Sequence, residues 1–422
     1  MLNGGGINPD GLSLDLQFAA DKTLTARRGP TPTFTRASTA TFVGSDGLIQ
    51  TAAIDIPRFD HDPVTLACKG LLIEEGRTNA LQHSANFKNT TSSSYWENIT
   101  GTTVTVDQTT SPDGGVNADL LSTSATAFDC FFRRANIWAA STQYTYSVFL
   151  KQGPSNHRYV GLYIGVGVSA LKFPFFDFNN PTVVQIPSGT MVGTINSTRV
   201  DAYPNGWYRV IVTFTTAATP ATTNCGAYIS TSDGTLPASS AAGLDAYVWG
   251  IQSELGAFPT SYIPTTTAPL TRSADVCSIT GANFTSFYNQ SEGTFLSSTQ
   301  LFSFGNDYSA SYWNVFNPPN YMRVSLYSQT STQELSYLQN NDGTLASTVA
   351  SEPSRISRTA GAYQLNNARI VKNGTLGVLD TTFTPYSNFI SLSITPQVSG
   401  TINSLRYYKK RLPDAKLQAL TA

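Results

Sequence analysis

Residues 247–275 read YVWGIQSELGAFPTSYIPTTTAPLTRSAD, and this stretch decides the fold class. Its first part alternates, with Tyr247, Trp249 and Ile251 on one side, which is typical of a β-strand. Prolines then recur at five-residue intervals, at Pro259, Pro264 and Pro269. Prolines at this density cannot continue a sheet. We therefore expect a strand that closes one domain and leads into an exposed linker, which proteases should cut near residues 265–267.

The composition of the 422-residue chain predicts an all-β protein. Charged residues make up 13%, about half the usual share, while hydrophobic residues make up 40%. The 20 Tyr and 23 Phe favour pleated, half-buried surfaces, and 32 Gly and 22 Pro supply turns. The length predicts two or three domains.

Charge and targeting patterns exclude several classes of partner. The net charge of −1 argues against nucleic acid, because phosphate contacts need clustered Lys and Arg. No apolar run is long enough to span a membrane, and the start MLNGGGINPDG lacks a secretory signal, so we expect assembly in a bacterial cytoplasm. The cysteines show no metal-binding spacing, and we expect buried thiols, with disulfides left open if the protein matures outside the cell: Cys68, Cys130, Cys225 and Cys277.

Short extended segments separated by turns fill residues 82–270. Residues 144–150 and 208–214 alternate as half-buried strands do, and such strands at regular spacing are the signature of a two-sheet sandwich. The motifs SYW, SPDG, NGWYR and VWGIQSELG follow in this order. They resemble the carbohydrate-binding-module-like jelly rolls of surface proteins from tailed phages and gene transfer agents. The resemblance implies a jelly roll over residues 82–270.

Residues 1–81 contain FTRASTATFVGSDGLIQTAAIDIPRFDHDP and then GLLIEEGRTNAL. From Phe34 to Leu81 this block resembles the N-terminal region that precedes glycan-binding modules in phage tail and head-spike proteins. Its apolar content looks too small for an independent core. We therefore expect a small N-terminal region that attaches the protein to capsid or tail subunits.

Residues 271–422 begin their strand pattern at EGTFLSSTQLFSFG and end with GTINSLRYYKKRLPDAKLQALTA. This is similar to concanavalin-A-like lectin sandwiches in the same kind of protein. Pro413 suits the first turn of a short helix, and Leu417 and Leu420 are spaced to dock that helix on the sandwich. The whole chain is thus expected to form tandem jelly-roll β-sandwiches with less than one-tenth helix.

Two acidic motifs invite a catalytic or metal-binding interpretation. Glu74 and Glu75 are adjacent, so on a strand they point to opposite faces and cannot flank one glycosidic bond. We expect one of them to bond Arg77 or Arg36 and the other to be solvated.

His61 lies between Asp60 and Asp62, which favours a turn with solvated carboxylates over a metal site. The sequence contains no GxSxG, HExxH, P-loop or EF-hand pattern. We expect no catalytic residues and no enzyme.

Sugar binding requires exposed aromatic faces and polar side chains that bond hydroxyls. The segment FGNDYSASYWNVFNPPNYMR supplies the candidates Asp307, Tyr308, Tyr312, Trp313, Asn317, Asn320 and Tyr321. Trp138 could serve as a platform or as core, while Trp96, Trp207 and Trp249 are expected in the core. Asp307 and Asp342 could bind Ca²⁺, but their spacing is not diagnostic, so no metal and no cofactor is assigned.

The resemblance implies a virion-surface head-spike or tail-fibre protein, present as an oligomer or in many copies, that binds a capsular polysaccharide for host attachment. Two alternatives stay open. A particle-borne polysaccharide-degrading enzyme would use carboxylates that meet only in the fold. A capsid decoration protein would bind no ligand.

Overall fold

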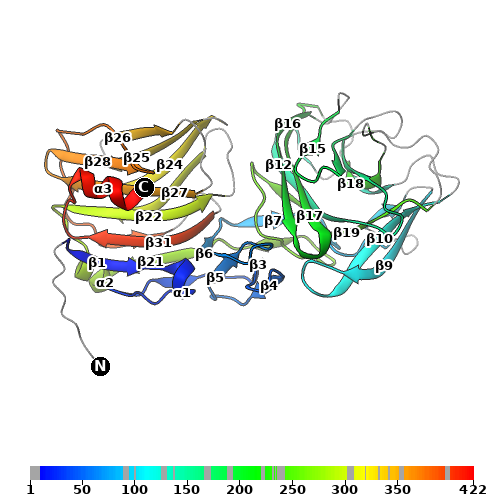
Figure 1. Cartoon of the computed structure of the whole chain (residues 1–422), viewed down its shortest axis with the longest axis horizontal. Helices are drawn as coiled ribbons and strands as arrows, with labels where there is room; N and C mark the ends of the chain where they lie inside the picture. Colours follow the sequence, from blue (N-terminus) through cyan, green and yellow to red (C-terminus); the bar gives the residue numbers. More distant parts are fainter. Residues whose placement is uncertain are drawn as a thin grey trace.

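The computed structural model contains two β-sandwiches joined by a narrower junction (Figure 1). It describes residues 10–422 apart from 89–94, 99–100, 125–130, 136–137, 166–172, 188–192, 220–223, 231, 233, 235–242, 302–307, 319, 331–332, 341–342, 351–355 and 395–399. Helix in this described part is limited to short segments: α1 (Phe18–Asp21), α2 (Gly281–Phe287), α3 (Asp414–Thr421) and the 3-10 turn η1 (Pro204–Gly206). The all-β prediction is confirmed. None of these helices is long and apolar enough to cross a membrane.

The central sandwich consists of two six-stranded antiparallel sheets between residues 97 and 255. The first sheet has the order β16 (Gly193–Tyr203), β17 (Trp207–Thr216), β12 (Gln143–Gln152), β19 (Asp245–Leu255), β10 (Val116–Thr123) and β9 (Thr102–Thr110). The second has the order β15 (Val184–Gln185), β14 (Phe175–Asp177), β13 (Tyr159–Gly165), β18 (Asn224–Ile229), β11 (Phe131–Ala135) and β8 (Glu97–Asn98). Their facing side chains form one buried core, which includes Trp96, Val148 and Val210.

A β-bulge reverses part of the predicted alternation in β19. Trp249 packs with Phe149 and Tyr262 on the outer face of the first sheet, as the period-two pattern implies. Ile251, which the pattern places on the same face, instead lies in the core between the sheets. The register of β12 and β19 shifts here, and Gly250 has φ of +61°, a backbone conformation that glycine adopts without steric penalty.

The terminal sandwich is built from both ends of the chain. Its first sheet has the order β29 (Thr375–Leu376), β28 (Asn367–Lys372), β27 (Ile356–Gln364), β22 (Gly293–Leu301), β31 (Gly400–Tyr408), β6 (Cys68–Ile73) and β5 (Arg58–His61), with β1 (Leu12–Leu16) also paired to β31. The second has the order β2 (Thr33–Thr35), β21 (Val276–Thr280), β30 (Ser391–Ser393), β23 (Tyr308–Asn317), β24 (Asn320–Thr330), β25 (Gln333–Asn340) and β26 (Gly343–Ala350).

The N-terminal strands therefore complete the terminal sandwich instead of forming a region of their own. In Figure 1, β1 lies beside β31, the last strand of the chain. Leu14, Leu16 and Phe18 are fully buried in the core of this sandwich, next to residues such as Trp313. The apolar content of residues 1–81 is too small for a separate core because it belongs to a larger one. The central sandwich is thus an insertion between strands of the terminal sandwich.

Helix α3 closes the terminal sandwich as predicted. Pro413 immediately precedes the helix, Leu417 is fully buried, and Leu420 packs against the same small cluster.

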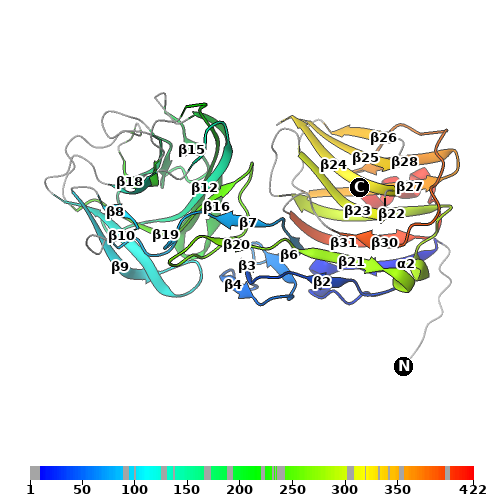
Figure 2. The same cartoon turned by 180° about the vertical axis from the view of Figure 1, so that it is seen from behind.

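The junction contains two short antiparallel pairs. One is the hairpin of β3 (Ala40–Val43) and β4 (Ile49–Ala52), and the other pairs β7 (Arg77–Asn79) with β20 (Leu270–Arg272) (Figure 2). The proline-rich segment 256–269 also packs here. Ile263 N–H donates to Gln252 Oε1 at 2.7 Å, and the Thr265 hydroxyl donates to the Leu81 carbonyl at 2.5 Å. Its central part is therefore fixed and buried, in contrast to the exposed linker that the prolines suggest.

Candidate functional site

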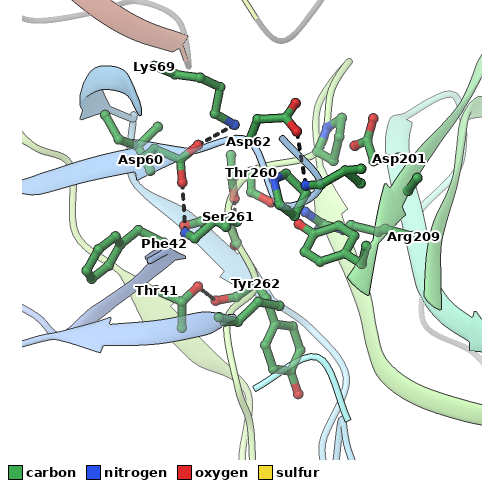
Figure 3. A pocket seen from close by; sticks show the side chains of 18 of the residues that line it. Thr41, Phe42, Asp60, Asp62, Lys69, Asp201, Arg209, Thr260, Ser261 and Tyr262 are labelled. Atoms are coloured by element: carbon green, nitrogen blue, oxygen red, sulfur yellow. Dashed lines mark hydrogen bonds and ion pairs between the residues drawn. The ribbon is translucent and has the colours of Figure 1, made fainter. Parts of the chain in front are cut away.

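A pocket of about 480 Å³ lies in the junction, between the hairpin β3–β4 and the edge of the central sandwich. Figure 3 shows its walls. Three segments far apart in the sequence line it: residues 41–43, 49, 60, 62–65, 69, 72 and 74; residues 199–203 and 209; and residues 259–262. Gln300 of β22 adds a contribution from the terminal sandwich. Phe42 and Tyr203 are half-buried residues of this lining, and the Tyr203 ring packs edge-on against Phe149 at 5.0 Å.

Two ion pairs belong to the lining. On the β5–β6 side, the Lys69 ammonium lies 2.5 Å from the Asp60 carboxylate, whose other oxygen accepts the Val43 N–H at 2.8 Å. On the β16 side, the Arg199 guanidinium lies 2.7 Å from Asp201. Figure 3 places Asp60 and Lys69 on one side of the pocket and Asp201 on the other.

Asp62 forms part of the rim and is held in its charged form. Its Oδ1 accepts the backbone N–H groups of Val64 at 3.0 Å and Thr65 at 2.8 Å. Burial alone would raise the pKa of Asp62, but these two N–H groups, the Thr65 hydroxyl and the Lys69 charge together outweigh it, and the pKa lies below its ordinary value. The carboxylate is therefore both ionised and fixed in direction at neutral pH.

Arg209 lies in the pocket wall beneath Tyr203 and is almost completely buried. It donates to the Thr260 carbonyl at 2.9 Å and to the Ser147 hydroxyl at 3.0 Å from Nη2. Burial lowers the pKa of Arg209, while Tyr203, Glu254 and Asp201 oppose that shift.

Thr260 connects this guanidinium to a buried carboxylate. Its backbone N–H and its hydroxyl both donate to Glu254, at 2.9 and 2.7 Å. Thr260 therefore hydrogen-bonds both the Arg209 guanidinium and the Glu254 carboxylate, and these bonds fix this part of the pocket wall.

Behind the pocket lies a buried charge cluster, which we define as Arg36, Arg58, Glu74, Arg272 and Asp275. The side chains of all five are 0–1% exposed. Glu74 accepts hydrogen bonds from Arg58 at 2.8 Å, from Arg272, and from the Ser261 N–H and hydroxyl at 2.7 Å each. Asp275 accepts from Arg58 at 2.6 Å and Arg36 at 3.2 Å.

This cluster joins all three segments of the junction. Arg58 lies in β5 and Glu74 directly follows β6, while Arg272 and Asp275 lie on the return to the terminal sandwich. Ser261 adds segment 256–269 through its hydrogen bonds to Glu74. Burying such charges is favourable only when every one is paired, so the cluster tolerates one arrangement of these segments. The remaining wall, at Arg209, is tied to segment 256–269 by the hydrogen bond to the Thr260 carbonyl.

The adjacent residues Glu74 and Glu75 lie in different environments. Glu75 pairs with Arg77, as expected, and is partly exposed. Glu74 is buried in the cluster, so the expectation that the second carboxylate of this pair is solvated is wrong.

His61 and Asp60 are both buried at the end of β5, and only Asp62 lies in a turn. The expectation of solvated carboxylates therefore fails for Asp60, because Lys69 and Val43 N–H satisfy it. Within the described residues, no group of three or more His, Cys, Asp or Glu side chains is arranged to hold a metal ion. Cys225 and Cys277 are buried, Cys68 is half-buried, and Cys130 lies outside the described residues.

Two of the aromatic candidates for sugar binding are core residues. Trp313 is 0% exposed and packs against Phe295, with ring centroids 5.0 Å apart. Trp138 is 6% exposed, packs edge-on against Phe214 at 4.7 Å and donates its indole N–H to Ser253 at 2.9 Å. Neither ring presents a face to solvent, which corrects their assignment as stacking platforms. Trp96, Trp207 and Trp249 are buried as expected.

The remaining candidates lie at or near the β23–β24 hairpin. Asn317 and Asn320 are partners across it and bond to Asn388 and Tyr386, while Arg323 covers the half-buried Tyr321 ring. Tyr308 and Tyr312 belong to β23, but their side chains are outside the description, and Asp307 and Asp342 lie outside the described residues. Among the candidates whose side chains the structure describes, none lines the junction pocket: Trp138, Trp313, Asn317, Asn320 and Tyr321.

Comparison with known proteins finds no matching family model and no matching curated protein. Among solved structures, Trypanosoma rangeli sialidase aligns at 7% identity and a TM-score of 0.27, covering 72% of this chain and 60% of the sialidase. The tandem CBM22 domains of Paenibacillus barcinonensis Xyn10C align at 10% identity and 0.26, covering 79% and 98%. Domains LG4–5 of the mouse laminin α1 chain align at 8% and 0.16, covering 80% and 83%. The chain spans only 60% of the sialidase it matches, and at these TM-scores the likenesses carry no argument about fold or function.

Proposed function

We propose that this protein is a surface component of a phage or gene-transfer-agent particle and binds a bacterial cell-surface glycan, without cleaving it, in the junction pocket. The observation that carries the proposal is the pocket itself. Its volume of about 480 Å³ lies within the usual range for small-molecule sites. Its lining combines half-buried aromatic rings with closely spaced donors and acceptors.

The chemistry of the lining suits a sugar. A pyranose has an apolar face, which Phe42 and Tyr203 could contact, and a ring of hydroxyls that both donate and accept. Asp62 and Gln300 offer polar atoms at partly exposed positions. Because the buried charge cluster fixes the walls, a sugar would not have to order them on binding, which favours affinity.

The particle context rests on the sequence motifs that resemble phage and gene-transfer-agent proteins. Since β1, β2, β5 and β6 belong to the terminal sandwich, attachment to capsid or tail subunits would use the surface of that sandwich. The central sandwich and the pocket would then be presented towards the cell. Weak single sites become effective when a particle displays many copies, through effective concentration.

Adsorption to cells tests this function. Particles carrying the protein should adsorb to capsulated cells and much less to capsule-deficient cells, and the variant Asp201→Asn should reduce adsorption. The matched control is Asp177→Asn, which removes a carboxylate from the Arg158–Asp177 ion pair outside the pocket lining. Equal adsorption to both kinds of cell would contradict the glycan receptor. Timed release of oligosaccharides by the purified protein would contradict binding without cleavage.

A further inference from the structure

We infer that the junction pocket selects a neutral sugar with vicinal hydroxyls and rejects sugars that carry a carboxylate. This inference rests on the proposed function and adds the class of glycan to it. It follows from how the charged groups of the pocket are already engaged.

The carboxylates of the pocket lining outnumber its cations by one, and the cations already have partners. Four carboxylates line the pocket, Asp60, Asp62, Glu74 and Asp201, against three cations, Lys69, Arg199 and Arg209. Lys69 and Arg199 already pair with carboxylates of the lining, at 2.5 and 2.7 Å.

Arg209 does not offer an open anion site either. It is 5% exposed and engaged by a carbonyl and a hydroxyl, and the carboxylates of Glu254 and Asp201 act on it electrostatically. A carboxylate on the ligand would lose its hydration on entering the pocket and would gain no uncommitted cation in return. It would also lie near Asp62, which is ionised at the rim. The pocket therefore disfavours acidic sugars.

An ion pair at a pocket wall suits neighbouring hydroxyls. The carboxylate accepts from one hydroxyl, while the ammonium or guanidinium donates to the next, so each pair can hold a vicinal diol without being broken. In the Arg199–Asp201 pair both side chains are partly exposed, whereas in the Asp60–Lys69 pair, on another side of the pocket, Lys69 is partly exposed and Asp60 is buried. Two such pairs offer contacts to two edges of one sugar or to neighbouring sugars of a chain.

Binding of the full chain to a panel of polysaccharides tests the inference. The panel contains neutral polymers of glucose, mannose and galactose, and polymers of uronic acid, each at low and high salt. We expect at least one neutral polymer to bind with an affinity at least about tenfold higher than any uronate polymer, since tenfold corresponds to one engaged hydrogen bond to a charged group. Salt should change the affinity little, because no net charge is neutralised. Periodate, which cleaves vicinal diols, should abolish binding.

Variants link the result to the pocket. Arg199→Gln should weaken binding to the neutral polymer by about tenfold or more. Arg158→Gln, which breaks a comparable surface ion pair outside the pocket lining, should leave it unchanged.

The outcomes separate this inference from the proposed function. Preferential binding of a uronate polymer, weakened by salt, would overturn the neutral-sugar inference while leaving glycan binding intact. Binding of a neutral polymer that survives periodate or Arg199→Gln would also overturn it. No binding to any polymer, together with equal adsorption to capsulated and capsule-deficient cells, would overturn the proposed function.

Discussion

Glu74 is fully buried and accepts hydrogen bonds from Arg58, Arg272 and Ser261. Replacing it by Gln removes the negative charge between two buried guanidinium groups. We predict that Glu74→Gln lowers the free energy of unfolding by about 3–5 kcal/mol, as expected for breaking a buried ion pair. Urea denaturation of the full chain, followed by circular dichroism, measures this change.

The neighbouring Glu75 is the matched control for this prediction. It differs by one position, is 31% exposed at its side chain and pairs with Arg77, which also stacks on Phe258. Glu75→Gln should cost less than about 1 kcal/mol, as partly exposed ion pairs usually do. Equal losses for the two variants would show that the buried cluster contributes no more than a surface pair.

The raised pKa of Asp119 predicts that the stability of the protein depends on pH. It is buried in the central sandwich, and burial raises its pKa to about 6 from 3.8, against the N–H groups of Phe87 and Asp107. Because the folded pKa lies above the unfolded one, the stabilisation is complete below about pH 4 and is lost as the pH rises through about 6. A shift of about two units corresponds to about 3 kcal/mol.

Asp119→Asn tests this contribution because asparagine does not titrate. The difference in free energy of unfolding between the wild type and the variant should change between about pH 4 and pH 7 by up to about 3 kcal/mol. Urea titrations at both pH values measure that difference. A constant difference would mean that Asp119 titrates alike in the folded and unfolded chains.

The residues of the pocket were not accessible to sequence reasoning. Asp62, Asp201 and Ser261 are ordinary polar residues that meet only because three distant segments meet. Trp313 failed as a candidate because an aromatic residue in a strand faces either solvent or core, and a cluster of aromatics does not say which. One available signal was the charge of Arg58 and Glu74 within or beside otherwise apolar strands, which points to a buried ionic network.

At the scale of elements, the packing of segment 256–269 determines where proteases can cut the chain. Thr260, Tyr262, Ile263 and Thr265 are buried, whereas the neighbouring Thr266 and Thr267 are exposed. We predict that residues 259–265 resist limited proteolysis, because a protease must first extract the segment from its hydrogen bonds. Mass spectrometry of early fragments measures the cleavage sites. Initial cleavage between residues 259 and 265 would contradict the packing described for this segment.

The sequence predicts a strand correctly where the alternation of apolar and polar residues lies within one short segment. Residues 144–150 and 208–214 lie in β12 and β17 because their alternation matches the two faces of a sheet, and α3 docks through Leu417 as its spacing indicates. Prediction failed where one residue changed the pattern or where the partner was remote. Gly250 shifts the register and turns Ile251 to the core, and nothing near β1 in the sequence indicates that β31 is its partner.

At the scale of the whole molecule, the insertion of the central sandwich predicts how the chain can be divided. A fragment of residues 77–272 keeps both central sheets and the β7–β20 pair. A fragment of residues 273–422 lacks β1, β2, β5 and β6, together with Leu14, Leu16 and Phe18 of its core. We predict that the first folds and the second does not. Cooperative thermal unfolding by circular dichroism distinguishes the two.

Supplying residues 10–76 as a separate peptide is the control for the second fragment. If the missing strands are the cause, the peptide should restore cooperative unfolding to residues 273–422. A cooperative transition of residues 273–422 alone would show that its remaining strands suffice.

The pairing of β1 with β31 also has a consequence for biosynthesis. Asp15 and Arg406, which bond across this pair, are 391 residues apart. A ribosome adding roughly 5–20 residues per second needs about 20–80 seconds to cover that distance. The central sandwich can close during this wait, since its strands are made in one run, while Leu14, Leu16 and Phe18 stay unpaired in water. Nascent chains halted near residue 300 should therefore crosslink to chaperones from a probe at Leu14, and completed chains should not. Equal crosslinking in halted and completed chains would mean that the exposure of Leu14 does not depend on the synthesis of β31.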